Sequence, residues 1–171
     1  MFRRIGQWID ELLLPKWPEL SIKPLLAEQW PTLDQLFGPG AYTLTAASRD
    51  VVHLVSDKAT GTFWYDYRDG YVDSMWSPGR IDPLTKEDNL HGSSQWCEFL
   101  GIENPQRDRR PISSAQVARE LEFATPVLAL FENRKETMAA LRHIEKRNCE
   151  YNDWAAGRAN DYQEFRPPDV I

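Results

Sequence analysis

Residues 41–76 constrain the fold more than any other part of the chain. In this segment the spacing of apolar residues changes to an alternation of apolar and polar side chains, with many β-branched and aromatic residues. Polar breaks fall at 48–50, at 57–61 and at Asp69-Gly70, a dipeptide typical of a two-residue hairpin turn. The pattern predicts a four-stranded antiparallel meander over residues 41–76.

Helical patterns precede the predicted sheet, within residues 1–40. The apolar positions of residues 1–13 share one helical face, and Pro15 ends the pattern, so we expect an amphipathic N-terminal helix that packs on the core. Thr32, followed three residues later by Gln35, has the spacing of a capping box and predicts a short helix.

Loops and helices follow the sheet. Residues 77–112 are interpreted as surface loops with one short helix at 93–100, which Gly101 ends. Ser113 has a capping-box partner in Gln116, so helices are predicted over 113–165, with Pro126 either bending the first or opening the next. Residues 166–171 are interpreted as a tail. No internal repeat is present, and we predict a single α+β domain spanning 1–171.

Composition limits the classes of function. The 171 residues carry a formal net charge of −6, with 42% apolar and 27% charged residues, as in soluble globular domains. An acidic chain is a poor candidate for binding nucleic acid, because that binding depends on clustered Lys and Arg, and no run of 18 apolar residues predicts a membrane span. Cys97 and Cys149 are interpreted as reduced thiols, and with no secretory leader recognised we expect a cytoplasmic protein.

The predicted hairpin places two carboxylates face to face. A two-residue turn at Asp69-Gly70 pairs Asp66 with Asp73, and like charges opposite one another destabilise a sheet. The same register puts Trp64 and Tyr71 on that face, whereas Phe63, Tyr65, Tyr67, Val72, Ser74 and Trp76 form the core-facing side. The acidic pair is therefore a candidate for binding a cation; alternatively, Arg68 neutralises it on a solvated face.

The net charge is concentrated around this hairpin. Residues 57–103 contain nine acids and four bases, for a charge of −5, whereas the rest of the chain carries −1. An acidic patch with aromatic anchors suits the binding of a basic protein, and a solvated acidic face is the alternative. The candidate partner-binding residues are Trp64, Asp66, Asp69, Tyr71, Asp73, Trp76, Asp82, Glu87 and Asp88.

Other candidate sites have weaker patterns. His53 lies in an apolar run and is interpreted as a satisfied residue within the sheet. His91 and Cys97 lack a third group that would orient them for nucleophilic catalysis, and with Glu98 they lack any recognised metal-ligand spacing. We therefore predict no catalytic residue, no bound metal and no cofactor.

The hairpin at residues 62–76 reads TFWYDYRDGYVDSMW and combines Asp with Trp and Tyr in a small acidic chain. In size, composition and architecture the chain resembles the immunity proteins of bacterial polymorphic and contact-dependent toxin systems. That resemblance implies a non-enzymatic inhibitor, here expected as a monomer or weak dimer, which covers the active site of its cognate toxin domain. The toxin domain of such systems is often basic, because its substrate is a nucleic acid.

Two other classes of function stay open. Asp66 and Asp73 are also a candidate acid–base or metal-binding pair of a small hydrolase or metal-dependent enzyme, which would need a cleft above the hairpin with His91 or Glu98 in it. An adaptor or chaperone for an effector protein would instead present an exposed groove along the N-terminal helix.

Overall fold

The computed structural model describes residues 21–66, 69–103 and 111–158. The predicted helix over 1–13, Tyr67 and Arg68 of the hairpin, and the predicted tail at 166–171 lie outside these ranges.

The sheet is an antiparallel meander, as predicted, with one additional short strand. Its strands follow one another in space in chain order, β1-β2-β3-β4-β5. They are β1 (Tyr42–Ala46), β2 (Val51–Ser56), β3 (Ala59–Asp66), β4 (Tyr71–Pro78) and β5 (His91–Gly92). The fifth strand was not predicted, because two residues are too few to show an alternating pattern.

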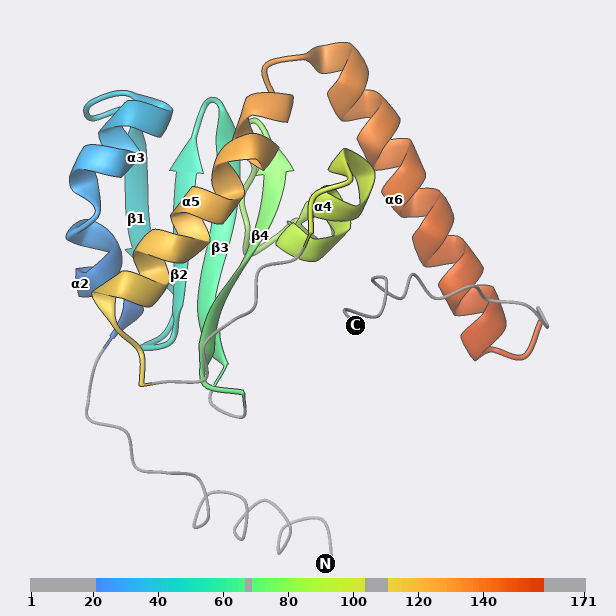
Figure 1. Cartoon of the computed structure of the whole chain (residues 1–171), viewed down its shortest axis with the longest axis horizontal. Coiled ribbons are helices and arrows are strands. Elements are labelled where there is room, and N and C mark those ends of the chain that lie inside the picture. Colours follow the sequence, from blue (N-terminus) through green and yellow to red (C-terminus); the bar gives the residue numbers. More distant parts are fainter. Residues whose placement is uncertain (1–20, 67–68, 104–110, 159–171) are drawn as a thin grey trace, which may run out of the picture.

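Helices cover one face of this sheet (Figure 1). They are α2 (Ile22–Ala27), α3 (Trp30–Phe37), α4 (Ser93–Leu100), α5 (Ser114–Leu130) and α6 (Arg134–Ala155). α5 runs across the sheet and contacts β4, α2 contacts the first three strands, and α6 packs on α4 and α5 before it extends away from the sheet. The fold is therefore α+β, with its core between the helices and one side of the sheet.

The predicted core face of the hairpin is confirmed. Phe63, Tyr65, Val72 and Trp76 are all buried in the hydrophobic core. A polar network lies among them: the Trp76 indole donates to Ser74 Oγ at 2.8 Å, and the Ser74 hydroxyl donates to Glu120 Oε1 of α5 at 2.7 Å. Ser93 Oγ also lies 3.2 Å from Glu120 Oε1. These bonds satisfy polar groups that would otherwise be costly to bury.

The structure confirms the predicted start of one helix and shifts that of another. Ser113 caps α5, because its hydroxyl accepts a hydrogen bond from the Gln116 backbone, but the Gln116 side chain donates to Gly70 O instead of completing the capping box. The short helix predicted from Thr32 and Gln35 is present, but Thr32 does not cap it: α3 already begins at Trp30, with Pro31 in its first turn, where the missing N–H costs nothing.

Of the two alternatives for Pro126, the one in which it opens the next helix is wrong. It lies inside α5, which continues to Leu130, and the chain reverses at Phe131 before Asn133 caps α6.

The register of the hairpin differs from the prediction by two residues. Asp66 lies opposite Tyr71, and Asp73 lies opposite Trp64. The loop is longer than two residues because Gly70, at φ +71°, donates its N–H to Asp66 O at 2.6 Å and closes a four-residue connection. A slip of two residues keeps every side chain on its predicted face, so the core face is unaffected.

Candidate protein-binding surface

The sheet face opposite the helices carries the predicted acidic and aromatic residues. Because directly opposed residues share a face, the register places Trp64 and Asp73, and next to them Asp66 and Tyr71, on this side. All four are partly exposed. Asp69 lies in the turn that follows, and its backbone N–H donates to Asp66 Oδ1 at 3.2 Å. The hairpin therefore presents Trp, Tyr and Asp side chains together.

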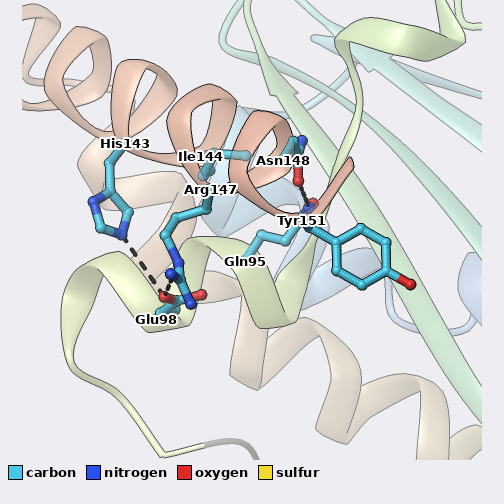
Figure 2. A pocket seen from close by; sticks show the side chains of 7 residues that line it. All are labelled: Gln95, Glu98, His143, Ile144, Arg147, Asn148 and Tyr151. Carbon is cyan, nitrogen blue, oxygen red and sulfur yellow. Dashed lines mark hydrogen bonds and ion pairs between the residues drawn. The ribbon is translucent and has the colours of Figure 1, made fainter. Parts of the chain in front are cut away.

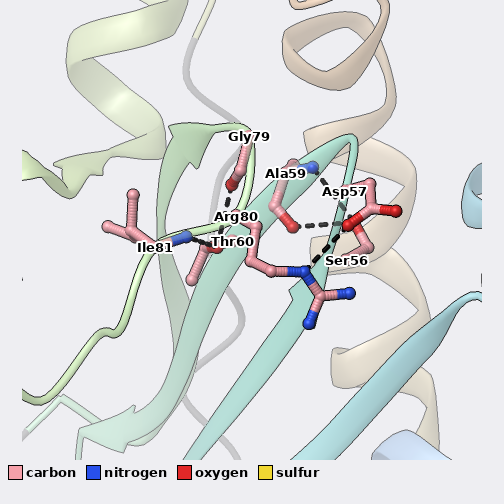
Figure 3. Close-up of polar contacts among 7 residues, drawn as sticks. All are labelled: Ser56, Asp57, Ala59, Thr60, Gly79, Arg80 and Ile81. Atoms are coloured by element: carbon pink, nitrogen blue, oxygen red, sulfur yellow. Dashed lines mark hydrogen bonds and ion pairs between the residues drawn. The ribbon is translucent and has the colours of Figure 1, made fainter.

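Residues 79–90, which we call the flap, cross this same sheet face. Figure 3 shows its start, where Thr60 Oγ1 donates to Gly79 O at 2.9 Å and accepts from Ile81 N at 3.0 Å. Further along, the flap and the side chains of β1 and β2 enclose a cavity. The chain thus passes from β4 across the sheet toward β1 and returns to form β5 beside β4. The segment predicted as loops, 77–112, thus begins inside β4, which ends at Pro78, and its first part lies over the sheet.

The flap brings three more predicted residues to this side of the molecule. Asp82, Glu87 and Asp88 are exposed, and within the described ranges no ion pair neutralises them. Asp82 Oδ1 accepts a hydrogen bond from Leu84 N at 3.0 Å, which fixes the local turn. Their charges are therefore available to a partner.

Two of the described cations near these acids, Lys58 and Arg80, are paired with other carboxylates, and Lys86 remains on the flap beside Glu87 and Asp88. Lys58 turns toward the helices, where its ammonium group lies 2.7 Å from Glu132 Oε1 and holds the pKa of that carboxyl below its usual range. Arg80 is engaged by Asp57 at 2.8 Å, as Figure 3 shows. The acidic character predicted from the charge distribution is thus retained on the folded surface.

Two details of the sequence prediction need correction. Trp76 is fully buried against the helices and cannot contact a partner; its indole packs edge-on against Phe63 with ring centroids 5.3 Å apart. Asp66 and Asp73 are not directly opposed, because each lies across from an aromatic residue. The remaining eight candidates lie on the open sheet face, in its turn or on the flap.

A polar pocket between α4 and α6 was not predicted (Figure 2). Its cavity of about 330 Å³ is lined on one side by Glu98, whose Oε1 lies 3.3 Å from Arg147 Nε and 3.8 Å from His143 Nε2. Gln95 donates to Asn148 Oδ1 at 3.1 Å, further along the same pair of helices. These contacts join α4 to α6, and the pairing of residues from two separate helices left no local signal in the sequence.

The side chains considered for catalysis lie in buried or closely packed surroundings. Cys97 is buried, and the His91 ring packs on Trp96 with centroids 5.7 Å apart, where burial lowers the pKa of His91. In the part of the chain that the structure describes, no group of three or more His, Cys, Asp or Glu side chains is placed to hold a metal ion. The same ranges contain no helix with the length and apolar character needed to cross a membrane.

His53 is the functional candidate that the sequence prediction understated. It is only 8% exposed, and its Nδ1 lies 2.9 Å from Thr62 Oγ1, but its Nε2 has no hydrogen-bond partner among the described residues. The expectation of a satisfied histidine therefore holds for one ring nitrogen and not for the other.

Comparison of the chain with protein-family models, with curated proteins and with solved structures finds no match.

Proposed function

We propose that the protein is a non-enzymatic inhibitor of the immunity-protein type, which binds a basic toxin domain through the open sheet face and the flap. We call this region the acidic surface. It consists of Trp64, Asp66, Asp69, Tyr71, Asp73, Asp82, Glu87 and Asp88. The observation that carries the proposal is the concentration of exposed and partly exposed acids, with partly exposed aromatic residues, on one side of a sheet whose other side is covered by helices.

In this proposal the acidic and the aromatic side chains have different physical roles. Exposed acids such as Glu87 and Asp88 accelerate encounter with a basic partner and exclude acidic ones. Trp64 and Tyr71 supply rigid apolar area that becomes buried in a complex, which is where most binding energy resides. A standard interface takes about 800 Å² from each partner, an area that a hairpin and its flanking loop readily provide.

The enzyme alternative loses its main geometric support. Asp66 and Asp73 face Tyr71 and Trp64 instead of each other, so the directly opposed acid pair on which this alternative rested is not formed. Neither of the cavities described here has Asp66 or Asp73 in its wall, and the pocket that contains Glu98 lies between α4 and α6. The adaptor alternative depends on a groove along residues 1–13, which lie outside the described ranges.

The test is neutralisation of the protein encoded by the neighbouring upstream gene. Expression of that protein should arrest bacterial growth, and co-expression of this chain should restore growth and yield a stoichiometric complex. A double charge reversal on the flap, Glu87→Lys with Asp88→Lys, should weaken the complex by about tenfold or more, because it replaces attraction with repulsion at the interface.

A matched double reversal on the helical side controls for net charge. Glu28→Lys with Glu122→Lys changes the same number of exposed acids by the same amount. The proposal predicts that this variant binds nearly as well as the wild-type protein. Equal losses for both double variants, or growth rescue without a complex, would overturn it.

A further inference from the structure

Strand β1 is an open edge of the sheet. It pairs with β2 along one side, and in the described residues no strand lies along its other side (Figure 1). The opposite edge of the sheet is β5, which has only two residues and leads directly into α4. An edge strand presents a row of backbone N–H and C=O groups that can pair with a further strand. β1 is therefore the edge at which another chain could extend this sheet.

The hydrogen-bond pattern shows which backbone groups of β1 point outward. Ala47 N donates to Val51 O at 3.0 Å, directly after the strand. In an antiparallel pair, residues that bond to the neighbouring strand alternate with residues whose backbone groups point away from it. Counted back from Ala47, this alternation directs the backbone groups of Thr45 and Thr43 toward β2. The backbone groups that point outward are those of Tyr42, Leu44 and Ala46.

The edge lacks the features that usually prevent pairing with another chain. Proteins protect exposed edges with charged residues, Pro, bulges or very short strands. β1 has five residues, YTLTA, with no charged residue and no Pro, and its register with β2 is continuous. The side chains of Thr43, Thr45 and Ala46 are exposed. A further strand would therefore meet neither a charge nor an irregular backbone along β1.

β1 is complementary to itself in an antiparallel register. With Leu44 on a two-fold axis, Leu44 pairs with its own copy and Tyr42 pairs with the second copy's Ala46. These are the residues with outward backbone groups, so the pairing forms about six hydrogen bonds between the chains. Thr43 then lies opposite the second copy's Thr45, and Thr–Thr pairs across strands are favourable. β1 carries no charge that would select an acidic or a basic peptide instead.

We propose that the protein forms a two-fold dimer in which the β1 strands of two copies pair antiparallel and join the two sheets. Because this pairing uses the β1 edge of both copies, the assembly closes at two chains. β2 and β3 separate β1 from β4. The dimer therefore does not require the hairpin part of the acidic surface, and it does not depend on the proposed inhibitor function.

The first test is sedimentation equilibrium of the wild-type chain. The mean mass should rise from one chain toward two between about 10 µM and 1 mM, as expected for a small interface. Each copy carries a net charge of −6, so added salt screens the repulsion between copies and should not weaken the dimer. A mass of one chain at every concentration, a species larger than two chains, or dissociation by salt would each overturn the proposal.

Amide hydrogen exchange followed by NMR locates the contact. The amides of Tyr42, Leu44 and Ala46 should exchange several-fold more slowly in concentrated than in dilute protein. Those of Thr43 and Thr45 point toward β2 and should change much less. Protection of the three outward amides at every dilution would mean that another part of the same chain covers the edge. That result, or association without added protection of these amides, would overturn the proposal.

Charge variants separate pairing from folding. Thr43→Lys with Thr45→Lys places like charges opposite each other across the two copies and should weaken the dimer at least about tenfold. Thr43→Glu with Thr45→Glu should do the same. Ser94→Lys with Thr125→Lys adds the same charge as the first variant at exposed positions on α4 and α5, and this control should dimerise like the wild-type protein.

Mixing the two β1 variants is the decisive experiment. The Lys variant and the Glu variant carry opposite charges at facing positions, so the mixture should form a heterodimer although each variant alone stays monomeric. NMR spectra of the separate variants report whether each is folded. Folded variants that fail to associate when mixed, or a control variant that loses dimerisation equally, would overturn the proposal.

Discussion

Asp73 lies directly opposite Trp64 in the pairing of β3 with β4, and this places an acid beside an aromatic ring on the open face of the sheet. The neighbouring pair, Asp66 opposite Tyr71, repeats the arrangement. Directly opposed carboxylates would repel each other, whereas the observed register separates them diagonally. The hairpin thus carries two acids without the penalty that the sequence-based register implied.

The two hairpin acids should contribute to partner binding through charge more than through folding. Asp66→Asn with Asp73→Asn keeps side-chain acceptors for the N–H groups of Asp69 and Ser74 while removing both charges. We expect binding of the basic partner to weaken by about 10- to 100-fold, mainly at low ionic strength. Calorimetric titration at two salt concentrations measures this, and an affinity equal to wild type in a folded variant would contradict it.

Gly61 should not tolerate a side chain. A Cβ atom at this position would lie 2.5 to 2.9 Å from three atoms of the Trp76 ring, which is fully buried and held by its bond to Ser74. Gly61→Ala should therefore lower the free energy of unfolding by about 1–3 kcal/mol, the usual cost of overpacking. Urea denaturation measures the loss.

A double-mutant cycle assigns that loss to the contact with Trp76. The smaller ring in Trp76→Phe withdraws from Gly61, so Gly61→Ala should cost less in this background than in the wild-type protein. Equal costs in both backgrounds would show that the strain arises elsewhere.

Ser74 should be important for stability although it is a small polar residue. Its hydroxyl accepts from the Trp76 indole and donates to Glu120 Oε1, so Ser74→Ala leaves a buried N–H without its acceptor. We expect a loss of about 1–3 kcal/mol in the free energy of unfolding. Ser94→Ala, at an exposed position on α4, is the control and should change stability little. Similar values for the two variants would contradict the role of the network.

Local patterns were sufficient for the parts of the fold that depend on periodicity and capping. Alternation placed Phe63 and Trp76 on the core side, and the hydroxyl of Ser113 marked the start of α5. The hairpin register was missed because Asp69-Gly70 resembles a two-residue turn, whereas the bond from Gly70 N to Asp66 O creates a longer one. The assignment of side chains to the two faces of the sheet stayed correct, because the error in the register was an even number of residues.

The charge of the candidate site could be predicted from the sequence, but its shape could not. The acids of the flap could be counted in the sequence, but the flap lies over the sheet through Ile81 and Thr60, which are 21 residues apart. No local pattern reports such a contact. For the same reason the cavity beside His53 was not predicted, since its wall combines β1 and β2 with a loop that follows β4.

Acidification should destabilise the fold through two histidines. Burial lowers the pKa of both His53 and His91 from the usual 6.5, although Glu87 and Asp82 act in the opposite direction at His53, and Glu145 does so at His91. Above pH 6.5 both rings are neutral in the folded and unfolded states, and their contribution to stability is fully present. As the pH falls below 6.5 the unfolded chain takes up protons first, so the free energy of unfolding decreases until the folded-state pKa values are passed.

Urea denaturation at a series of pH values between 7 and 5 measures this decrease, and NMR titration assigns it to the two rings. His53→Asn and His91→Asn should each reduce the dependence of stability on pH in this interval, because each removes one group whose proton uptake favours unfolding. Midpoints at or above pH 6.5 for both rings in the folded protein would show that burial does not control their protonation, and stability would then not fall through these groups.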